Sequence, residues 1–309
     1  MSILDDTRVM IKICKLYYHQ ELSQSKIAEI MGVSRPTVSK YLTHAKQKGI
    51  VEIKINENDL LELESQLEEE YDLEEVICVK ETKQLKTKLG LAGSNYLLRK
   101  LGNNDIVAVS AGTTMDQVVK NTNSNNKYSN VLFVPLVGGM GNASMDIHAN
   151  HIADSFSKCF GAHNMLLHAP VVVDDIEFKH FMMKQKFVSK VTEKMKQATI
   201  AIVGIGANPE QSTMVASYRD ELSFKDIKNK AIGDIMYNFI DENGEKINCE
   251  WNNRIISLDI EEYKKIPLKI GIAGGKNKEK AIKAALNNNL IDVLVTDENT
   301  GVELLKNND

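Results

Sequence analysis

From residue 75 onward, short and almost continuously apolar runs alternate with amphipathic segments. Runs of this kind are typical of parallel strands that are buried on both faces of a sheet. We expect such strands at residues 76–79, 106–110, 131–137, 200–204, 268–273 and 293–296. Helical patterns separate most of them, for example at residues 84–100, 147–160 and 279–286. The pattern predicts an α/β fold, a doubly wound domain, with an inserted hairpin whose turn is residues 241–244 after an apolar run at 235–240.

The first 55 residues have the pattern of three short amphipathic helices. The first helix, at about residues 5–18, turns its apolar positions towards the other two helices: Val9, Ile13, Leu16 and Tyr17. Ser23 can cap a second helix with one apolar face made of Ile27, Ala28, Ile30 and Met31. Gly32 supplies the left-handed turn that lets the chain double back. Residues 49–55 alternate apolar and polar positions, which predicts a short strand.

A third helix follows Ser34, which can cap it, and Pro36 is tolerated in its first turn. Together with the preceding helix this forms a helix-turn-helix, whose second helix enters the major groove of DNA with its N-terminal residues. Val38, Tyr41 and Leu42 point inward. We expect DNA to be contacted by the outer positions, which are Ser34, Arg35, Thr37, Ser39 and Lys40.

Charge is distributed unevenly along the chain. Residues 1–55 contain nine Lys or Arg and five Asp or Glu, a net charge of +4, whereas the other 254 residues carry −8. A basic end of this kind fits contact with phosphate. No apolar run approaches the ~18 residues that span a bilayer and no signal peptide is visible, so we expect a cytoplasmic protein. The four cysteines lie far apart, which predicts reduced thiols.

Three parts are therefore expected: a DNA-binding domain at residues 1–55, a helical linker at 56–74, and an effector-binding and oligomerisation domain at 75–309. The linker carries a leucine stripe, Leu60, Leu63 and Leu67. This stripe either docks on the following domain or forms a short coiled-coil seam between protomers. A role in dimerisation is slightly favoured.

Four predicted strands end in loops that suit a ligand, because ligands of such sheets gather at the carboxyl ends of strands. The loop after residue 109 can hold an anion such as phosphate, and the loop after residue 137 allows close backbone approach. The candidate effector-binding residues are Ser110, Gly112, Thr113, Thr114, Gly138, Gly139, Gly206, Asp234, Gly274, Gly275 and Lys276. Asp234 and Asp241 could bind hydroxyls of a sugar or polyol.

Other ligands have less support. Pro209 stands where the third glycine of a dinucleotide fingerprint would be, and no P-loop is present, so we expect no NAD or ATP and no other cofactor. His148, His151 and Asp154 could share a helix face, but no further ligands accompany them, so no metal is expected.

These motifs together resemble the SorC/DeoR-type bacterial transcriptional regulators, the sugar-binding SorC family. In the first 55 residues the likeness rests on LYY at 16–18, QSKIA at 24–28 and SRPTVS at 34–39. Further on it rests on VSAGTT at 109–114, LVGG at 136–139, AIGDI at 231–235, AGGK at 273–276 and NLIDVLVTD at 289–297. The resemblance implies a sugar-isomerase-like effector domain, a phosphorylated sugar or polyol as effector, and a dimer or tetramer on operator DNA near genes of carbohydrate uptake or catabolism. By that likeness, Thr113, Thr114 and Lys276 would hold the phosphate.

One departure from the family pattern concerns chemistry. In the deoxyribonucleoside-type members, a lysine just before the paired glycines is expected to form a Schiff base with an aldehyde sugar phosphate. Val137 stands at that place and has no amine, which excludes covalent capture there. The alternative function is a sugar-phosphate isomerase or deaminase with a DNA-binding head, but no spacing in the chain identifies an acid–base pair.

Overall fold

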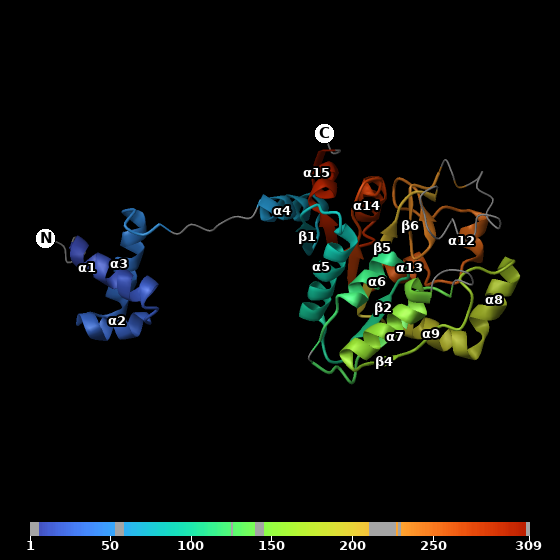
Figure 1. Cartoon of the computed structure of the whole chain (residues 1–309), viewed down its shortest axis with the longest axis horizontal. Helices are drawn as coiled ribbons and strands as arrows, with labels where there is room; N and C mark the ends of the chain where they lie inside the picture. The colour runs from blue at the N-terminus through green and yellow to red at the C-terminus, as the bar shows by residue number, and fades with distance from the viewer. Residues whose placement is uncertain are drawn as a thin grey trace. The chain divides into compact units, whose positions relative to one another are not determined.

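The computed structural model describes residues 6–52, 59–124, 126–139, 145–209, 227 and 230–306. The chain divides into two compact units, Met1–Glu57 and Asn58–Asp309, which Figure 1 shows together. Each unit has its own hydrophobic core.

The N-terminal unit is a small helical bundle. It consists of α1 (Thr7–Cys14), the π-helical turn η2 (Lys15–His19), α2 (Gln24–Met31) and α3 (Arg35–Gln47). Ser23 and Ser34 cap α2 and α3, because their side chains accept hydrogen bonds from the amides of Lys26 and Thr37, each at 3.3 Å. Gly32 ends α2 in the left-handed conformation, with φ at 65°. The predicted helix-turn-helix is thus formed as the sequence indicated.

The N-terminal unit differs from the expectation in one core position and in one predicted strand. It contains Met10, Ile13, Cys14, Ile27, Ala28, Val38, Tyr41, Leu42 and Ala45. Ile30, which the sequence pattern places on the buried face of α2, has 50% of its surface exposed, because it lies away from the Ile27–Ala28 stripe. The predicted strand at 49–55 is wrong over residues 49–52, which form a turn and a bend after α3, and residues 53–55 lie outside the described part.

The C-terminal unit is built on a parallel sheet with the strand order β1-β9-β8-β5-β2-β3-β4. Its strands are β1 (Glu75–Val79), β2 (Ile106–Val109), β3 (Leu132–Pro135), β4 (His163–Asn164), β5 (Ile200–Gly206), β8 (Leu268–Ile272) and β9 (Val293–Asp297). Six of these strands fall on the predicted apolar runs and most of their residues are buried, so the α/β fold class is confirmed. The two-residue β4 was not predicted.

Helices cover both faces of this sheet (Figure 1). One face is covered by α5 (Leu85–Lys100), α6 (Thr113–Lys120) and α7 (Ala149–Phe160). The other carries α4 (Asp59–Tyr71), α9 (Lys186–Lys196), α14 (Glu279–Asn287) and α15 (Glu298–Lys306). The remaining described helices are short or peripheral: η3 (Met145–Ile147), α8 (Ile176–Lys184), α12 (Glu250–Arg254) and α13 (Ile260–Tyr263). Val107 and Val109 face the first layer and Ala108 the second, as the two-residue period of a strand requires.

An antiparallel extension prolongs the sheet beyond β5. It is formed by β6 (Gly233–Ile235) and β7 (Asn238–Ile240), and β6 pairs with the end of β5. The apolar run 235–240 that precedes the predicted turn is not one strand, because Met236 and Tyr237 form a two-residue turn with φ values of 50° and 61°. Such a pair of positive φ values is what a tight hairpin needs. The predicted turn at 241–244 is confirmed, since the Gly244 amide donates to the Asp241 carbonyl at 3.0 Å.

Helix α4 packs on its own C-terminal unit. Leu60, Leu63 and Leu67 are buried in the core beside β1 and α15. Two glutamates of α4 also accept hydrogen bonds from the edge strand: Glu68 from the Val76 amide at 2.8 Å and Glu64 from the Cys78 amide at 2.6 Å. These bonds occupy amides of β1 that an edge strand would otherwise present to another chain. The leucine stripe is therefore used within the protomer rather than as a seam.

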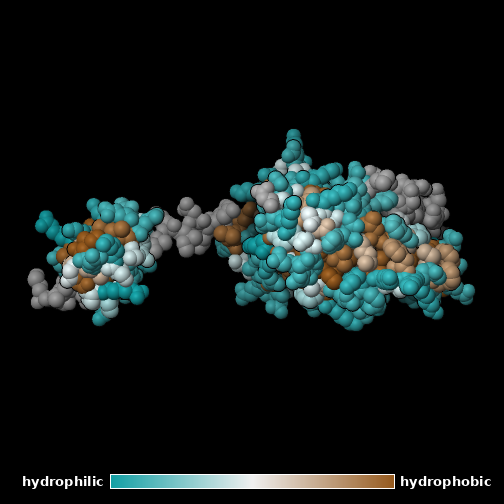
Figure 2. Space-filling view, turned by 90° about the horizontal axis from the view of Figure 1, so that it is seen from below, coloured by the Kyte–Doolittle hydropathy of each residue, from teal (hydrophilic) through white to brown (hydrophobic). Residues whose placement is uncertain are grey.

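The surface of the C-terminal unit has an apolar region. Hydrophobic side chains gather at the end of the unit that α8 and α9 form (Figure 2). The exposed members are Ile176, Phe178, Phe181 and Phe187. Within the described residues, no helix combines the length and apolar character required to cross a bilayer.

The packing of α4 yields a stability prediction. Leu67→Ala should lower the free energy of unfolding of the C-terminal unit by about 2–5 kcal/mol, because it empties a fully buried position. Leu61→Ala is the matched control, since Leu61 lies in the same helix with 52% of its surface exposed, and it should change stability by less than about 0.5 kcal/mol. Urea unfolding measures both, and equal effects would contradict the assigned packing.

Candidate functional site

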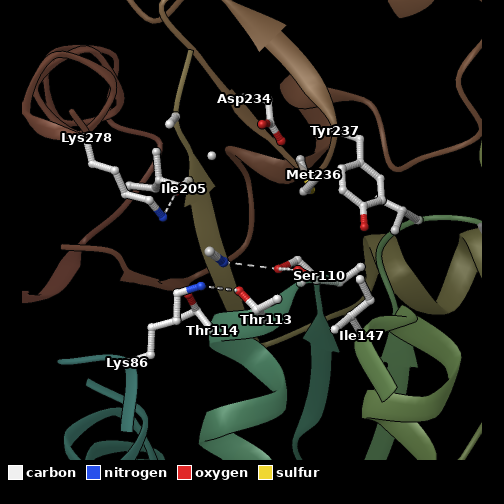
Figure 3. A pocket seen from close by; sticks show the side chains of 16 residues that line it. Lys86, Ser110, Thr113, Thr114, Ile147, Ile205, Asp234, Met236, Tyr237 and Lys278 are labelled. Carbon is white, nitrogen blue, oxygen red and sulfur yellow. Dashed lines mark hydrogen bonds between the residues drawn. The ribbon is translucent and has the colours of Figure 1, made fainter. Parts of the chain in front are cut away.

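A cavity of about 210 Å³ opens where the order of the sheet reverses. From β2 the chain proceeds outward through β3 to β4, and it then returns to β5 on the other side of β2. Loops after adjacent strands diverge at such a point and leave a crevice at the carboxyl ends of the strands. The lining residues are Lys86, Ser110, Ala111, Gly112, Thr113, Thr114, Val137, Ile147, Gly204, Ile205, Gly206, Ala207, Asp234, Met236, Tyr237 and Lys278 (Figure 3).

Ser110 joins the two strands at the floor of the cavity. Its amide donates to the Ile202 carbonyl at 3.1 Å, which continues the ladder between β2 and β5. Its hydroxyl accepts a hydrogen bond from the Gly204 amide, also at 3.1 Å. The side chain is almost completely buried. Ser110 therefore fixes the spacing of the two loops that form the cavity.

The N-terminus of α6 forms one wall. Gly112 precedes this helix with φ at 119°, and Thr113 and Thr114 occupy its first turn. The first amides of a helix have no partner within the helix and carry partial positive charge, so they attract anions. Lys86, from the first turn of α5, places its ammonium 3.0 Å from the Thr113 hydroxyl. Two helix starts thus supply hydroxyls, amides and a cation to the same side of the cavity.

The facing wall carries the buried carboxyl of Asp234 and the partly buried side chain of Lys278. Burial raises the pKa of Asp234 to about 6, although the charge of Lys278 and the Tyr237 amide act in the opposite direction. Burial also lowers the pKa of Lys278, whose ammonium donates to the Ile205 carbonyl at 2.7 Å. Gly206 makes room for the carboxyl, because a Cβ at that position would lie 1.8 Å from the Asp234 Oδ2 atom.

The tight turn between β6 and β7 completes this wall with Met236 and Tyr237. The Trp251 indole donates to the Tyr237 carbonyl at 2.8 Å, and the Asn238 amide side chain donates to the Met236 carbonyl at 3.2 Å. These bonds hold a turn whose left-handed residues are not glycine. In Figure 3 the Tyr237 hydroxyl is directed to the side of the cavity that Ser110 and Ile147 form.

The structure brings together six of the predicted effector-binding residues. Those that line the cavity are Ser110, Gly112, Thr113, Thr114, Gly206 and Asp234. They come from the ends of β2 and β5 and from the antiparallel strand β6 that pairs with the end of β5, so the arrangement of the sheet rather than sequence proximity brings them together.

The other five predicted residues do not line this cavity. Gly138 and Gly139 approach the backbone of residues 169–171, and a Cβ on Gly138 would lie 2.3 Å from the Pro170 carbonyl oxygen. Gly274 and Gly275 pack against the end of β9, where the Gly275 amide donates to Asp297 at 2.6 Å. Lys276 is exposed. Close contacts between protein segments therefore require glycine at positions 138 and 274, and the positive φ of 93° favours glycine at position 275.

Sequence reasoning missed three polar residues of the cavity: Lys86, Lys278 and Tyr237. Lys278 is two residues beyond the selected Lys276, and only the path of the loop before α14 decides which amine turns inward. Lys86 begins a helix and does not follow a strand. Tyr237 lies in the apolar run 235–240, which carried no signal for the additional turn at Met236 and Tyr237.

Two further candidates have structural tasks. The Asp241 carboxylate accepts hydrogen bonds from the amides of Asn243 and Glu245, both at 2.9 Å, and so fixes the turn. Asp154 pairs with Lys158 at 2.6 Å, and His151 lies 3.9 Å from Asp146. The described residues contain no group of three or more His, Cys, Asp or Glu side chains arranged to hold a metal.

The candidate DNA-binding surface lies on α3 of the N-terminal unit. Arg35, Ser39 and Lys40 are exposed, whereas Val38, Tyr41 and Leu42 are buried. The Ser34 and Thr37 hydroxyls are 2.8 Å apart, so they are hydrogen-bonded to each other at the start of the helix. The helix therefore presents cations and a hydroxyl on its outer face while its inner face is fixed by the core.

Comparison with known proteins connects both units to one family. Residues 56–306 match the sugar-binding domain family Sugar-bind, and residues 13–60 match the MarR family. The deoxyribonucleoside regulator of Bacillus subtilis (strain 168) is 31% identical over 305 residues, which cover 96% of this chain and 97% of that protein. The sorbitol operon regulator of Klebsiella pneumoniae is 30% identical, over 99% of this chain and 100% of its own. The crystal structure of that full-length regulator, SorC, superposes with a TM-score of 0.75 at 27% identity, covering 97% of this chain and 99% of its own.

The environment of Asp234 yields a pH prediction. Its native pKa of about 6 lies above the ordinary value of 3.8, so the stability that this carboxyl contributes is complete below about pH 4 and is lost as the pH rises through 6. Asp234→Asn does not titrate. The free energy of unfolding of the variant, relative to the natural protein, should therefore rise between pH 4 and 6 and stay level above, as measured by urea unfolding. A difference that is constant with pH would show that Asp234 titrates normally.

Proposed function

Since the chain belongs to the SorC family of sugar-binding, DNA-binding transcriptional regulators, we propose that it controls genes of carbohydrate uptake or catabolism in response to a phosphorylated sugar or polyol. The observation that carries this proposal is the cavity between β2 and β5, where a helix N-terminus and two lysines face a buried carboxyl. We place its action in the cytoplasm, where operator DNA is accessible.

The phosphate of the effector is proposed to bind at the first turn of α6. The Thr113 and Thr114 hydroxyls, the amides of that turn and the Lys86 ammonium converge there. A dianion gains from all three kinds of donor, because charge-assisted hydrogen bonds are stronger than neutral ones. Lys278 can add a second cation from the facing wall. Lys276, which is exposed, has no part in this proposal.

The hydroxyl-bearing part of the effector is proposed to face Asp234 and Tyr237. A carboxylate accepts hydrogen bonds from sugar hydroxyls, and a tyrosine offers a ring face and a hydroxyl. Val137 lines the same cavity and has no amine, so the effector binds without a covalent bond at this position. We propose binding without turnover, and product formation from a sugar phosphate would favour the enzyme alternative.

The regulatory step is proposed to be a change in the relative affinity for two arrangements of the protein. Effector that contacts loops from both halves of the sheet favours the arrangement in which these loops are closed. To switch operator occupancy substantially, the two affinities for the effector must differ by a few kcal/mol. Closure can then either release the protein from operator DNA or recruit it.

Self-association is also proposed, as a dimer or tetramer. A helix-turn-helix reads a short half-site, and two copies one helical turn apart read an inverted repeat. The exposed side chains Phe178 and Phe181 of α8, with Phe187 of α9, form an apolar surface that a second protomer could cover.

Thermal melting tests the effector site. A panel of sugars and polyols, each with and without phosphate, should contain a phosphorylated member that raises the melting temperature, because a ligand of the folded state stabilises it by mass action. Thr113→Val should lower the affinity for that ligand roughly tenfold or more. The substitution removes a hydrogen bond to a charged group, and such a bond contributes about 1.5–3 kcal/mol.

Thr87→Val is the matched control, because Thr87 is exposed on α5 and does not line the cavity. It should leave the response unchanged. Equal stabilisation by unphosphorylated members, or an unchanged response in Thr113→Val, would contradict a phosphate subsite at α6.

The DNA-binding surface is tested with duplexes selected from random sequence. Arg35→Ala should weaken binding to the selected site by about 1–3 kcal/mol and relax specificity at one base pair, if Arg35 contacts guanine. Lys40→Ala is the comparison. It should weaken binding to all DNA sequences equally, and the affinity of this variant should depend less on salt concentration. Uniform weakening by Arg35→Ala would reduce Arg35 to a phosphate contact. The mass of the complex on an inverted repeat reports how many protomers bind.

A further inference from the structure

A second cavity, of about 240 Å³, lies between α8, α9 and the chain around α13. It shares none of its described lining residues with the cavity between β2 and β5. Three lysines from separate segments line it: Lys179 of α8, Lys196 of α9 and Lys246, which follows β7. Asp259 and Glu262 are the acidic residues of the lining.

The two acidic residues are already engaged with other groups. Asp259 caps α13, because its carboxylate accepts a hydrogen bond from the Glu261 amide at 2.9 Å, and it lies 3.9 Å from the Lys246 ammonium. Glu262 pairs with Lys265 at 2.8 Å. The Glu262 carboxylate is therefore engaged with a lysine outside the lining, whereas Asp259 faces Lys246, which itself lines the cavity.

Lys179 is left without such a partner. Within the described part of the chain, its ammonium makes no hydrogen bond or ion pair. Burial and the neighbouring charge of Lys246 lower the pKa of Lys179, while Asp259 only partly opposes this effect. Like charges that face one cavity repel each other, and an anion between them converts this repulsion into attraction.

Helix α8 is held by few apolar contacts, made by the partly buried Met182 and Met183. None of its residues is buried, and its two large aromatic residues, Phe178 and Phe181, lie on the exposed side. A nine-residue helix has little stability of its own, so tertiary contacts must hold it. Lys179 and Met183 are the residues of α8 that line the cavity. A ligand that binds Lys179 would attach α8 to the body of the unit.

We propose that this second cavity binds a small multivalent anion, of the phosphate or polycarboxylate class, between Lys179, Lys246 and Lys196. Lys246 lies 3.9 Å from Asp259 and Lys196 lies 3.4 Å from Glu193, so a bound anion would share these two ammonium groups with exposed carboxylates and would add the contact that Lys179 lacks. The Ser257 hydroxyl also lines the cavity, and because it accepts from the Asn238 side chain at 3.1 Å, its own hydrogen can be donated to the same oxygens. The bound anion fixes α8, and its site is independent of the effector site.

The test uses the full chain carrying Thr113→Val, so that the proposed effector site is impaired. Inorganic phosphate and citrate are added separately at constant ionic strength, and hydrogen exchange of the α8 amides is measured. One of the two anions should slow exchange in α8 in a saturable way. Lys179→Met should weaken this response at least about tenfold, as an ammonium contact to a multivalent anion is lost.

Lys190→Met is the matched control, since Lys190 lies on α9 and does not line the cavity. Lys246→Met provides a second loss variant should Lys179→Met not fold. Unchanged exchange in α8 with both anions, or an equal response in the Lys179 and Lys190 variants, would overturn the proposal. A response to phosphate alone, or to citrate alone, identifies the class. The proposed effector site can fail its own melting test without affecting this outcome.

Discussion

The parallel pairing of β2 with β5 is the constraint on which the candidate site depends. These strands are separated by about ninety residues in the chain, yet Val107 and Ile200 are register partners. Because the order of the sheet reverses between them, their following loops diverge and leave a cavity. The Ser110 hydroxyl, which accepts from the Gly204 amide, maintains this arrangement from within. Loss of that pairing would separate the anion-attracting turn of α6 from the wall that carries Asp234.

The two walls of the cavity have opposite chemical character, and this gives a ligand a direction. One side of the cavity is suited to an anion, because it is formed by the N-terminus of α6, its threonine hydroxyls and Lys86. Asp234 forms the other side, where burial keeps part of the carboxyl protonated near pH 6. Lys278 can serve either side, because its ammonium donates to the Ile205 carbonyl and also interacts electrostatically with Asp234. An effector with one anionic end and one hydroxyl-bearing end fits this division better than a symmetric ligand does.

The loops that sequence analysis grouped together divide into two kinds in the fold. The loops after β2 and β5 contribute directly to the cavity. Gly138 and Gly274 instead allow two protein segments to approach more closely than a Cβ atom would permit. A glycine after a strand permits close approach whether the partner is a ligand or another piece of backbone. Only the partner's position distinguishes the two cases. For the same reason Lys276 and Lys278, two residues apart, could not be told apart by residue type.

The sequence by itself determined the helix-turn-helix, the parallel strands and the α/β class, because caps, turns and hydrophobic periodicity are local properties of the chain. It also selected residues of the α6 turn and Asp234, which line the cavity. Tertiary structure alone decided that α4 docks on β1 and α15, that Met236 and Tyr237 form a turn, and that Lys86 and Lys278 enter the cavity. These outcomes depend on contacts between segments far apart in the chain, and such contacts leave no periodic signal in the residues that make them.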